Sequence, residues 1–429
     1  MISSIDLLRQ GKPPPDFEAL SELTVGIEPF VTFVKEKYLQ DYIALGGSKI
    51  KFVTGRPGSG KTHFLSYLSA NAEQLGFVTV SFSARDVWLH DFKEVYLEIF
   101  KRCDLMSCLK SCADEVIKNL GYDPKDMEEG VTFADYLSSI GEFDPITKKE
   151  IRNQLRSFFL KNPLIDNNFA AACSLLTGGI LGHPTLESSA KELLMGWLSC
   201  NSQARLAEVR RLGLSPSKVT KYNARHMLRS LLAVYKQAGK PGIVVTVDDM
   251  EILAGKNVMD TIRYTKMKRE DAYECIRELI DEIDTLQHVM FIFAFDRKLI
   301  DDEISRLKSY QALWMRVQNE IVSDMFNPFT DIIDLDSLGK RIYSRDAMIE
   351  MSKRLALLMA RNNQFAKPIG DEKAEALLTG DVYAPVALPR QVGQATICHL
   401  AENLPTPSEC EAEAISGNDS VEGGSDYGF

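Results

Sequence analysis

"KFVTGRPGSGKTHFL", residues 51–65, contains the most informative pattern in the sequence. A short apolar run leads into a glycine-rich loop, and the loop ends in a lysine, a threonine and a second apolar run. Residues 55–62 match the pattern G-x-x-x-x-G-K-[ST], which is typical of a loop that wraps phosphate groups. Glycines let successive backbone N–H groups face an anion, and a following helix adds the partial positive charge of its N-terminus. The stretch therefore predicts a phosphate-binding loop between a strand and a helix.

The loop predicts a nucleoside triphosphate, with ATP and Mg²⁺ as the ligands. Lys61 is expected to reach the β- and γ-phosphates, and the Thr62 hydroxyl is expected to coordinate Mg²⁺. The loop residues predicted to hold the nucleotide are Gly55, Pro57, Gly58, Ser59, Gly60, Lys61, Thr62 and His63.

A second acidic motif completes the predicted site. "IVVTVDD", residues 243–249, reads as a buried strand that ends in two carboxylates. Asp248 is expected to hold Mg²⁺ through water, and Asp249 is expected to polarise the attacking water. Hydrolytic enzymes of this type usually carry Glu at the second position, so Asp249 makes binding a firmer prediction than fast hydrolysis. Glu251 is a further carboxylate with either a catalytic or a structural role.

Strands and helices alternate around these motifs in the order expected of a parallel sheet with crossover helices. Strands are predicted at residues 49–55, 77–84, 242–249 and 288–296, whereas residues 105–216 read as helices. The predicted parts are an ATPase core in two pieces (1–104 and 217–326), a helical insertion (105–216), a helical lid (327–404) and an acidic disordered tail (405–429). The predicted fold class is α/β, and we expect a P-loop NTPase of the AAA+ or STAND type for the reasons given below.

Composition agrees with an ordinary globular protein. The chain has 429 residues, 45% hydrophobic and 26% charged, with a formal net charge of −10, which argues against nonspecific coating of nucleic acid. Its eight cysteines form no zinc-binding pattern and are expected to be buried or idle thiols. No signal sequence or membrane span is predicted, so the expected location is cytoplasmic.

Other P-loop classes lack their own motifs here. No Asn/Thr-Lys-x-Asp motif for reading guanine follows the second strand, and the Ser-Gly-Gly signature of ABC-type ATPases is absent. A small-molecule kinase remains open. AAA+ and STAND proteins add a polar sensor, an arginine finger and a lid arginine, for which the candidates are Asp296 with Arg297, Arg316 and Arg390.

Several stretches, in order along the chain, resemble the BrxC/BrxD-type ATPases of bacterial BREX phage-defence systems. They are "LLRQGKPPPDFEALSELTVGIEPFV", the loop itself, "HDFKEVYLEIF", "NARHMLRSLLAVYKQAGKPGIVVTVDDME", "AYECIRELID" and "YQALWMRV". The resemblance covers most of residues 4–400, and the length is more similar to BrxD. It implies an AAA+ core of the origin-recognition branch, ATP hydrolysis, assembly into an oligomer, and work on DNA beside partners such as a DNA helicase. It also implies that Gly26 and Glu28 lie near the adenine, and it favours Arg316 as finger and Arg390 as lid arginine.

A cluster of basic residues is the predicted contact with the backbone of double-stranded DNA. Its members are Arg205, Arg210, Arg211, Lys218, Lys221, Arg225 and Arg229. The alternative is a solvated helix face paired with acids. For the whole chain, an ATP-gated scaffold that scarcely hydrolyses ATP is the main rival to an ATPase.

Overall fold

The computed structural model describes residues 7–8, 10–254, 262–301, 306–318, 330–362, 367–378 and 388–402. Two compact units make up the chain. The sheet unit contains Phe30–Arg56 and Leu68–Asp334, and the helical unit contains Met1–Pro29, Pro57–Tyr67 and Leu335–Phe429. The acidic tail predicted at 405–429 lies outside the described residues.

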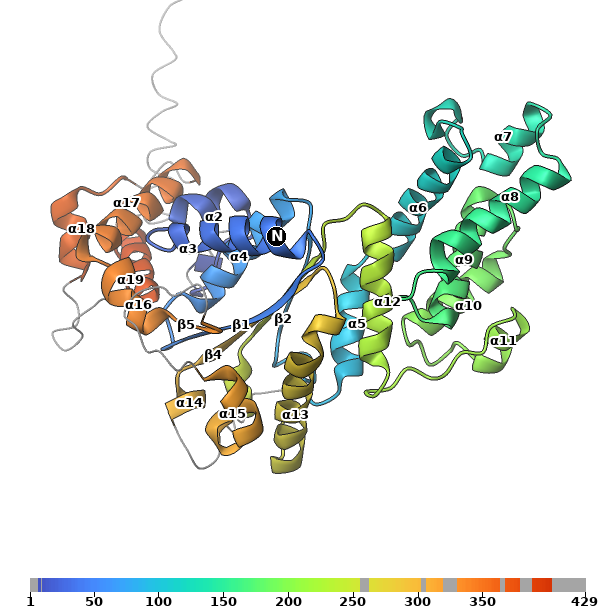
Figure 1. Ribbon diagram of the computed structural model, residues 1–429. Coiled ribbons are helices and arrows are strands. Elements are labelled where there is room, and N and C mark those ends of the chain that lie inside the picture. Colours follow the sequence, from blue (N-terminus) through green and yellow to red (C-terminus); the bar gives the residue numbers. More distant parts are fainter. Residues whose placement is uncertain are drawn as a thin grey trace, which may run out of the picture. The chain divides into compact units, whose positions relative to one another are not determined.

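One five-stranded parallel sheet forms the centre of the sheet unit (Figure 1). The strand order is β2-β3-β4-β1-β5. The strands are β1 (Ser48–Gly55), β2 (Val78–Ser83), β3 (Ile243–Asp248), β4 (Val289–Asp296) and β5 (Ile332–Asp334). The chain runs from β1 to the far edge at β2, returns through β3 and β4, and crosses β1 to reach β5. The carboxyl ends of all five strands therefore meet at one edge.

The apolar runs of the central strands explain their position. All eight residues of β4 are buried, as are Ile243 to Val247 of β3. Parallel strands covered on both faces carry such continuous apolar sequences, whereas strands with one wet face alternate. The four strands predicted at 49–55, 77–84, 242–249 and 288–296 are confirmed, with β3 ending at Asp248, one residue before the predicted end.

The strand β5 corrects the expectation that residues 327–404 contain helices only. Ile332 and Ile333 are buried and pair with Phe52 and Val53 of β1. The strand is three residues long and lies between acidic residues, so it offers neither a period of two nor a long apolar run. Its strand conformation depends on the pairing with β1.

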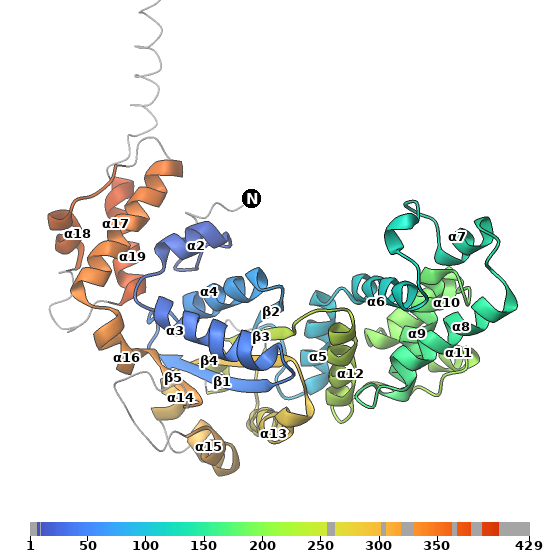
Figure 2. The ribbon, with the colours of Figure 1, turned by 45° about the horizontal axis from the view of Figure 1, so that its top comes forward.

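Helices surround the sheet and extend beyond β2 (Figures 1 and 2). Those of the sheet unit are η1 (Val34–Ile43), α5 (Phe92–Arg102), α6 (Leu105–Asn119), η2 (Pro124–Asp126), α7 (Phe133–Ser139), α8 (Pro145–Leu155), η3 (Arg156–Leu160), α9 (Asn167–Leu181), α10 (Ser188–Leu198), α11 (Leu206–Arg211), α12 (Ala224–Gln237), η4 (Met250–Leu253), α13 (Lys266–Glu282), η5 (Ile283–Thr285), α14 (Lys298–Asp301), η6 (Leu307–Ser309) and α15 (Gln311–Val317). Two more helices have residues in both units, α3 (Glu28–Phe33) and α4 (Lys61–Gln74). Among the described residues, no helix is long and apolar enough to cross a membrane.

Residues 105–216, all of them described, contain helices and no strand. Their core includes the fully buried Cys112 and Cys173, together with Cys108. Burial raises the pKa of the Cys112 thiol to about 12, so this thiol stays protonated at neutral pH. Such cysteines serve as small apolar side chains.

The helical unit joins the two ends of the described chain. Its own helices are α2 (Phe17–Leu23), α16 (Leu335–Ile342), α17 (Arg345–Asn362), α18 (Asp371–Leu378) and α19 (Pro389–Glu402). Leu23 of α2 shares one hydrophobic cluster with Leu355 of α17 and Ile397 of α19. Arg354 adds hydrogen bonds to the backbone oxygens of Glu22 (3.3 Å) and Thr24 (3.1 Å), where α2 ends. A cation at the carboxyl end of a helix satisfies the unpaired carbonyls there.

A buried lysine anchors the start of β5. Lys51 of β1 is 2% exposed, and its ammonium group donates to the backbone oxygen of Thr330 at 2.5 Å. The carboxylate of Asp331 lies 3.5 Å away. Burial, aided by the nearby charge of Lys49, lowers the pKa of Lys51 from 10.5 to about 8. The folded chain therefore binds this proton less tightly than the unfolded chain.

This lowered pKa predicts a pH-dependent stability. Between about pH 8 and 10.5 the unfolded chain holds more protons at Lys51 than the folded chain, so the free energy of unfolding rises with pH. Below about pH 8 the penalty is complete and constant. Lys51→Met removes the titration, so the free energy of unfolding of the native chain relative to this variant should increase by about 2 kcal/mol from pH 7 to 9.5. Urea unfolding measures it, and an equal difference at both pH values would contradict the assignment.

Candidate functional site

The loop predicted to wrap phosphates connects β1 to α4. Gly58 has a φ of +88° and Gly60 a φ of +93°, which are backbone conformations that side-chain-bearing residues rarely adopt. A Cβ atom at Gly60 would lie 2.8 Å from the hydroxyl oxygen of Tyr343. Glycine is thus favoured at Gly58 because of its backbone conformation. At Gly60 it is favoured both by the backbone conformation and by the lack of room for a Cβ atom beside Tyr343.

The loop has the properties of an anion cradle. Ser59 is 1% exposed, and its hydroxyl has no hydrogen-bond partner among the described residues. Lys61 and Thr62 form the first turn of α4, and the N-terminus of a helix carries a partial positive charge that favours anions. The residues present therefore fit the phosphate groups of a nucleotide.

A pocket in the helical unit adjoins this loop. Its lining combines apolar residues with Lys61, Thr62, Arg390 and Gln394, which carry polar side chains. Such a combination is typical of small-molecule sites. The pocket is lined by the loop residues Gly58, Gly60, Lys61, Thr62 and His63, by the N-terminal residues Leu8, Gly11, Lys12, Pro13, Leu23, Val25 and Ile27, and by the C-terminal residues Tyr343, Met351, Leu355, Pro389, Arg390, Gly393, Gln394 and Ile397.

The predicted adenine residues occupy different places relative to this pocket. Gly26 lies between the lining residues Val25 and Ile27, and its φ is +87°. A Cβ there would lie 2.3 Å from the backbone oxygen of Ile342, so Gly26 permits close packing against the end of α16. Glu28, the first residue of α3, is not among the residues that line the pocket.

His63 connects the loop helix to the end of α2. Its Nε2 atom lies 2.9 Å from the Thr24 hydroxyl, which itself donates to the backbone oxygen of Leu20 at 2.8 Å. The Thr24 proton is thus committed, so His63 Nε2–H is the donor. Burial lowers the pKa of His63 to about 4. The ring is therefore neutral at physiological pH and acts as a fixed hydrogen-bonding group.

The acids of the second motif lie at the carboxyl edge of the sheet. Asp248 ends β3, and its carboxylate accepts the backbone N–H of Asp249 at 2.8 Å. Asp249 has the left-handed values φ 58° and ψ 30°. Asp and Asn tolerate this conformation better than longer side chains do, because their short polar groups bond locally. The backbone thus explains why Asp stands where Glu is more usual.

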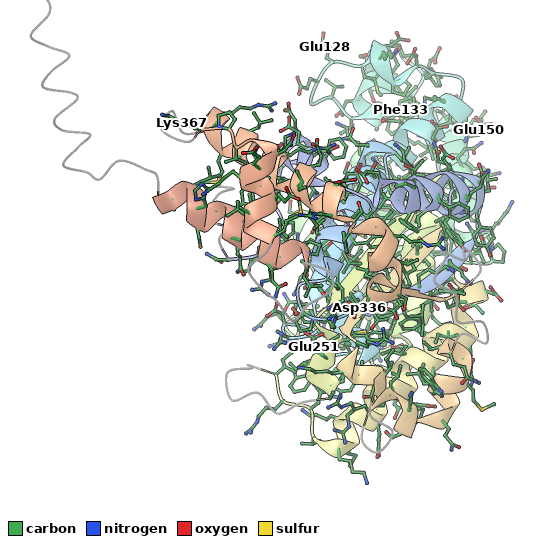
Figure 3. The ribbon with its side chains drawn as sticks, turned by 90° about the vertical axis from the view of Figure 1, so that its left-hand side faces the viewer. Glu128, Phe133, Glu150, Glu251, Asp336 and Lys367 are labelled. Carbon is green, nitrogen blue, oxygen red and sulfur yellow. The ribbon has the colours of Figure 1, made fainter. Side chains whose placement is uncertain are left out.

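Asp249 and Glu251 turn toward different neighbouring strands. Asp249 Oδ2 accepts the hydroxyl proton of Ser83, at the end of β2, at 2.7 Å. Glu251, labelled in Figure 3, accepts the backbone N–H of Asp296, at the end of β4, at 3.2 Å. Burial raises the pKa of Glu251, with a contribution from the two aspartates. A carboxylate with a raised pKa is a better proton acceptor.

Arg85 lies between these two carboxylates. Its Nη2 atom is 3.4 Å from Glu251 Oε1, and its Nε atom is 3.6 Å from Asp249 Oδ1. Neither Arg85 nor Ser83 was predicted from the sequence. Both lie just where β2 ends, so the rule that parallel strands expose functional groups at their carboxyl ends could have indicated them.

The register of the sheet relates these acids to the glycine loop. Gly55, the first loop residue, pairs with Asp296, and the N–H of Arg297 donates to the backbone oxygen of Gly55 at 3.2 Å. The predicted sensor residues Asp296 and Arg297 therefore lie beside the start of the loop. Arg297 also forms a 2.8 Å ion pair with Asp334 at the end of β5.

The two predicted arginines differ in their surroundings. Arg390 lines the pocket, and its backbone N–H donates to the backbone oxygen of Gly58 at 3.3 Å. Arg316 lies on α15, where its Nη2 donates to Asp281 of α13 at 3.0 Å. Arg390 is thus close to the glycine loop within the helical unit, whereas Arg316 is held by an acid of its own chain.

The basic residues predicted to contact DNA separate into two groups. Arg225 is committed to ion pairs of 2.7 Å with Glu278 and Glu282, and its side chain is 12% exposed. Arg210 and Arg211 are exposed at the end of α11. Arg210 and Arg211 are therefore accessible to the phosphates of DNA, whereas the ion pairs of Arg225 connect α12 to α13.

Among the described residues, no group of three or more His, Cys, Asp or Glu side chains is arranged to hold a metal ion. A magnesium ion that accompanies a nucleotide takes most of its ligands from phosphates and water, so it requires no such group. The residues predicted to hold it, Thr62 and Asp248, are of the right oxygen-donor type.

Comparison with known proteins gives the family. A sequence profile described as "BREX system ATP-binding protein BrxC/D" matches residues 3–387. No match was found among curated proteins. The matched range includes the glycine loop, the acids after β3 and most of the pocket residues. The chain therefore belongs to the BrxC/BrxD family of BREX system ATP-binding proteins.

Proposed function

We propose that this protein is a P-loop ATPase of the AAA+ or STAND type that acts in BREX anti-phage defence. It couples ATP binding and hydrolysis to assembly on DNA or on a helicase partner. The observation that carries the proposal is the glycine loop, with two positive-φ glycines, beside an apolar pocket of the helical unit. Membership in an ATP-binding family supports it.

The proposed nucleotide site assigns a role to each part of the loop. Backbone N–H groups of residues 58–62 bind the phosphates, and Lys61 neutralises the β- and γ-phosphates. The apolar lining residues Val25 and Ile27 receive the base. Thr62 and Asp248 remain the predicted Mg²⁺ ligands, and the ion supplies charge neutralisation on the phosphates when bound.

For hydrolysis we assign the general base to Glu251. Its carboxylate bonds to the end of β4, the strand that pairs with β1, whereas the Asp249 carboxylate bonds to Ser83 on β2. The raised pKa of Glu251 strengthens it as a proton acceptor. Asp249 then shapes the turn and pairs with Arg85.

One set of contacts favours the second candidate function, a scaffold gated by ATP. Both carboxylates already have partners, because Ser83 holds Asp249, and the Asp296 N–H and Arg85 hold Glu251. This arrangement suits a resting state with slow turnover. Hydrolysis then requires a partner, DNA or a neighbouring subunit to release a carboxylate, and Arg316 of a neighbouring subunit is the proposed finger.

The first test concerns the phosphate-binding lysine. Lys61→Ala removes a charge-assisted contact with two phosphates and should weaken ATP binding by roughly a hundredfold, as titration calorimetry can measure. Lys110→Ala, which changes an exposed lysine of α6, is the control and should bind ATP as the native chain does. Native affinity in the Lys61 variant would refute the nucleotide site.

Substitution by the isosteric amides distinguishes the roles of Glu251 and Asp249. Glu251→Gln should lower the rate of phosphate release by roughly a hundredfold or more while ATP still binds, because a general base contributes that much. Asp249→Asn keeps a residue that tolerates the left-handed conformation and should lower the rate much less. The reverse order would assign the base to Asp249. Absence of phosphate release from the native chain, alone and with DNA, would favour the scaffold.

The proposed contact with DNA predicts a salt signature. Arg210→Glu with Arg211→Glu should weaken binding of double-stranded DNA at all sequences and reduce the slope of log K against log salt by about 2. Lys110→Glu with Lys118→Glu, at exposed positions on α6, makes the same change in net charge and is the control. An equal loss in both variants would show a general charge effect, and no loss in either would exclude this surface.

A further inference from the structure

Two consecutive carbonyl groups of the glycine loop are hydrogen-bonded to Tyr343, which follows α16, and to Arg390 of α19. The hydroxyl of Tyr343 donates to the backbone oxygen of Ser59 at 2.9 Å. The backbone N–H of Arg390 donates to the backbone oxygen of Gly58 at 3.3 Å. Both contacts lie within the helical unit.

These contacts determine where the neighbouring N–H groups point. A trans peptide group is planar, and its C=O and N–H bonds point in opposite directions. When the Ser59 oxygen is held toward Tyr343, the N–H of Gly60 points to the other side. In the same way, the bond from Arg390 to the Gly58 oxygen directs the N–H of Ser59.

Two successive N–H groups that point to one side form a concave anion site. Gly58 and Gly60, with φ values of +88° and +93°, allow the backbone to adopt this arrangement. A loop of glycines is also free to rotate its peptide groups, so the arrangement requires external support. Tyr343 and Arg390 are placed to supply that support.

Tyr343 is a tight and buried part of this arrangement. It is 6% exposed, follows α16 directly, and lines the pocket. Its hydroxyl would lie 2.8 Å from a Cβ atom at Gly60, so the phenol packs directly against the loop. Burial holds the pKa of the Tyr343 hydroxyl well above its usual value, so the hydroxyl remains a donor at physiological pH.

We propose that Tyr343 is a positioning residue that aims the Ser59–Gly60 peptide of the loop at the nucleotide phosphates. Through Tyr343 the C-terminal helices set the affinity for the triphosphate part of the ligand and not for the base. The proposal rests on the proposed nucleotide site. It makes the packing of α16 and α17 around Tyr343 a direct determinant of phosphate binding.

Tyr343→Phe tests this role because it keeps the ring and removes the donor. The variant should bind ATP about three- to tenfold more weakly, the effect of losing one ordinary hydrogen bond, while its affinity for adenosine stays unchanged. Titration calorimetry with ATP and with adenosine measures both. Tyr222→Phe, at a tyrosine that is 79% exposed, is the control and should change neither affinity.

These measurements distinguish a failure of the proposed nucleotide site from a failure of the positioning role of Tyr343. A native chain that does not bind ATP would refute the proposed function itself. A native chain that binds ATP, with a Tyr343→Phe variant of equal ATP affinity, would overturn only the positioning role. Equal losses for ATP and adenosine would also overturn it, because they indicate a packing defect of the whole pocket.

Discussion

The parallel pairing of β1 with β4 and β5 is the constraint on which the rest of the structure depends. It places Gly55, where the glycine loop begins, in register with Asp296, where β4 ends. Since β3 pairs with the other side of β4, its acids come to the same edge of the sheet. The buried apolar runs of β3 and β4 hold this register, because every residue of β4 is packed on both faces. Residues from distant parts of the sequence are thereby brought to one edge of the sheet.

At this edge the local backbone conformation determines which hydrogen-bond partners Asp249 and Glu251 reach. Asp249 adopts a left-handed conformation and is directed to β2, while Glu251, two residues later, reaches the end of β4. The short acid Asp249 thus occupies the position beside the strand end, where the backbone is left-handed, and the longer acid Glu251 lies two residues further along. Arg85 pairs with both carboxylates and limits the cost of placing several like charges together.

Much of this arrangement could be predicted from the sequence, and the exceptions have physical causes. The strands β3 and β4 could be predicted from continuous apolar runs, β1 and β2 from shorter apolar stretches, and the glycine loop from its sequence pattern. β5 could not be found, because three residues carry no periodicity and depend on β1 for their conformation. Tyr343 carries no local signal, since its contact with Ser59 joins residues 284 positions apart. The ion pairs of Arg225 and Arg316 could not be predicted either, because a sequence gives the charge of an arginine and not the identity of its partner.

The helical unit has a consequence for how the protein is made. Its hydrophobic cluster combines Leu23 with Leu355 and Ile397, and its pocket combines the same two ends of the chain with the glycine loop. Leu23 is synthesised long before Ile397, so α2 cannot pack against α17 and α19 until those helices have been made. The last strand of the sheet ends earlier, at residue 334. Nascent chains that stop before α19 therefore contain all five strands of the sheet but lack several residues of the pocket lining, which is complete only after Ile397 has been added.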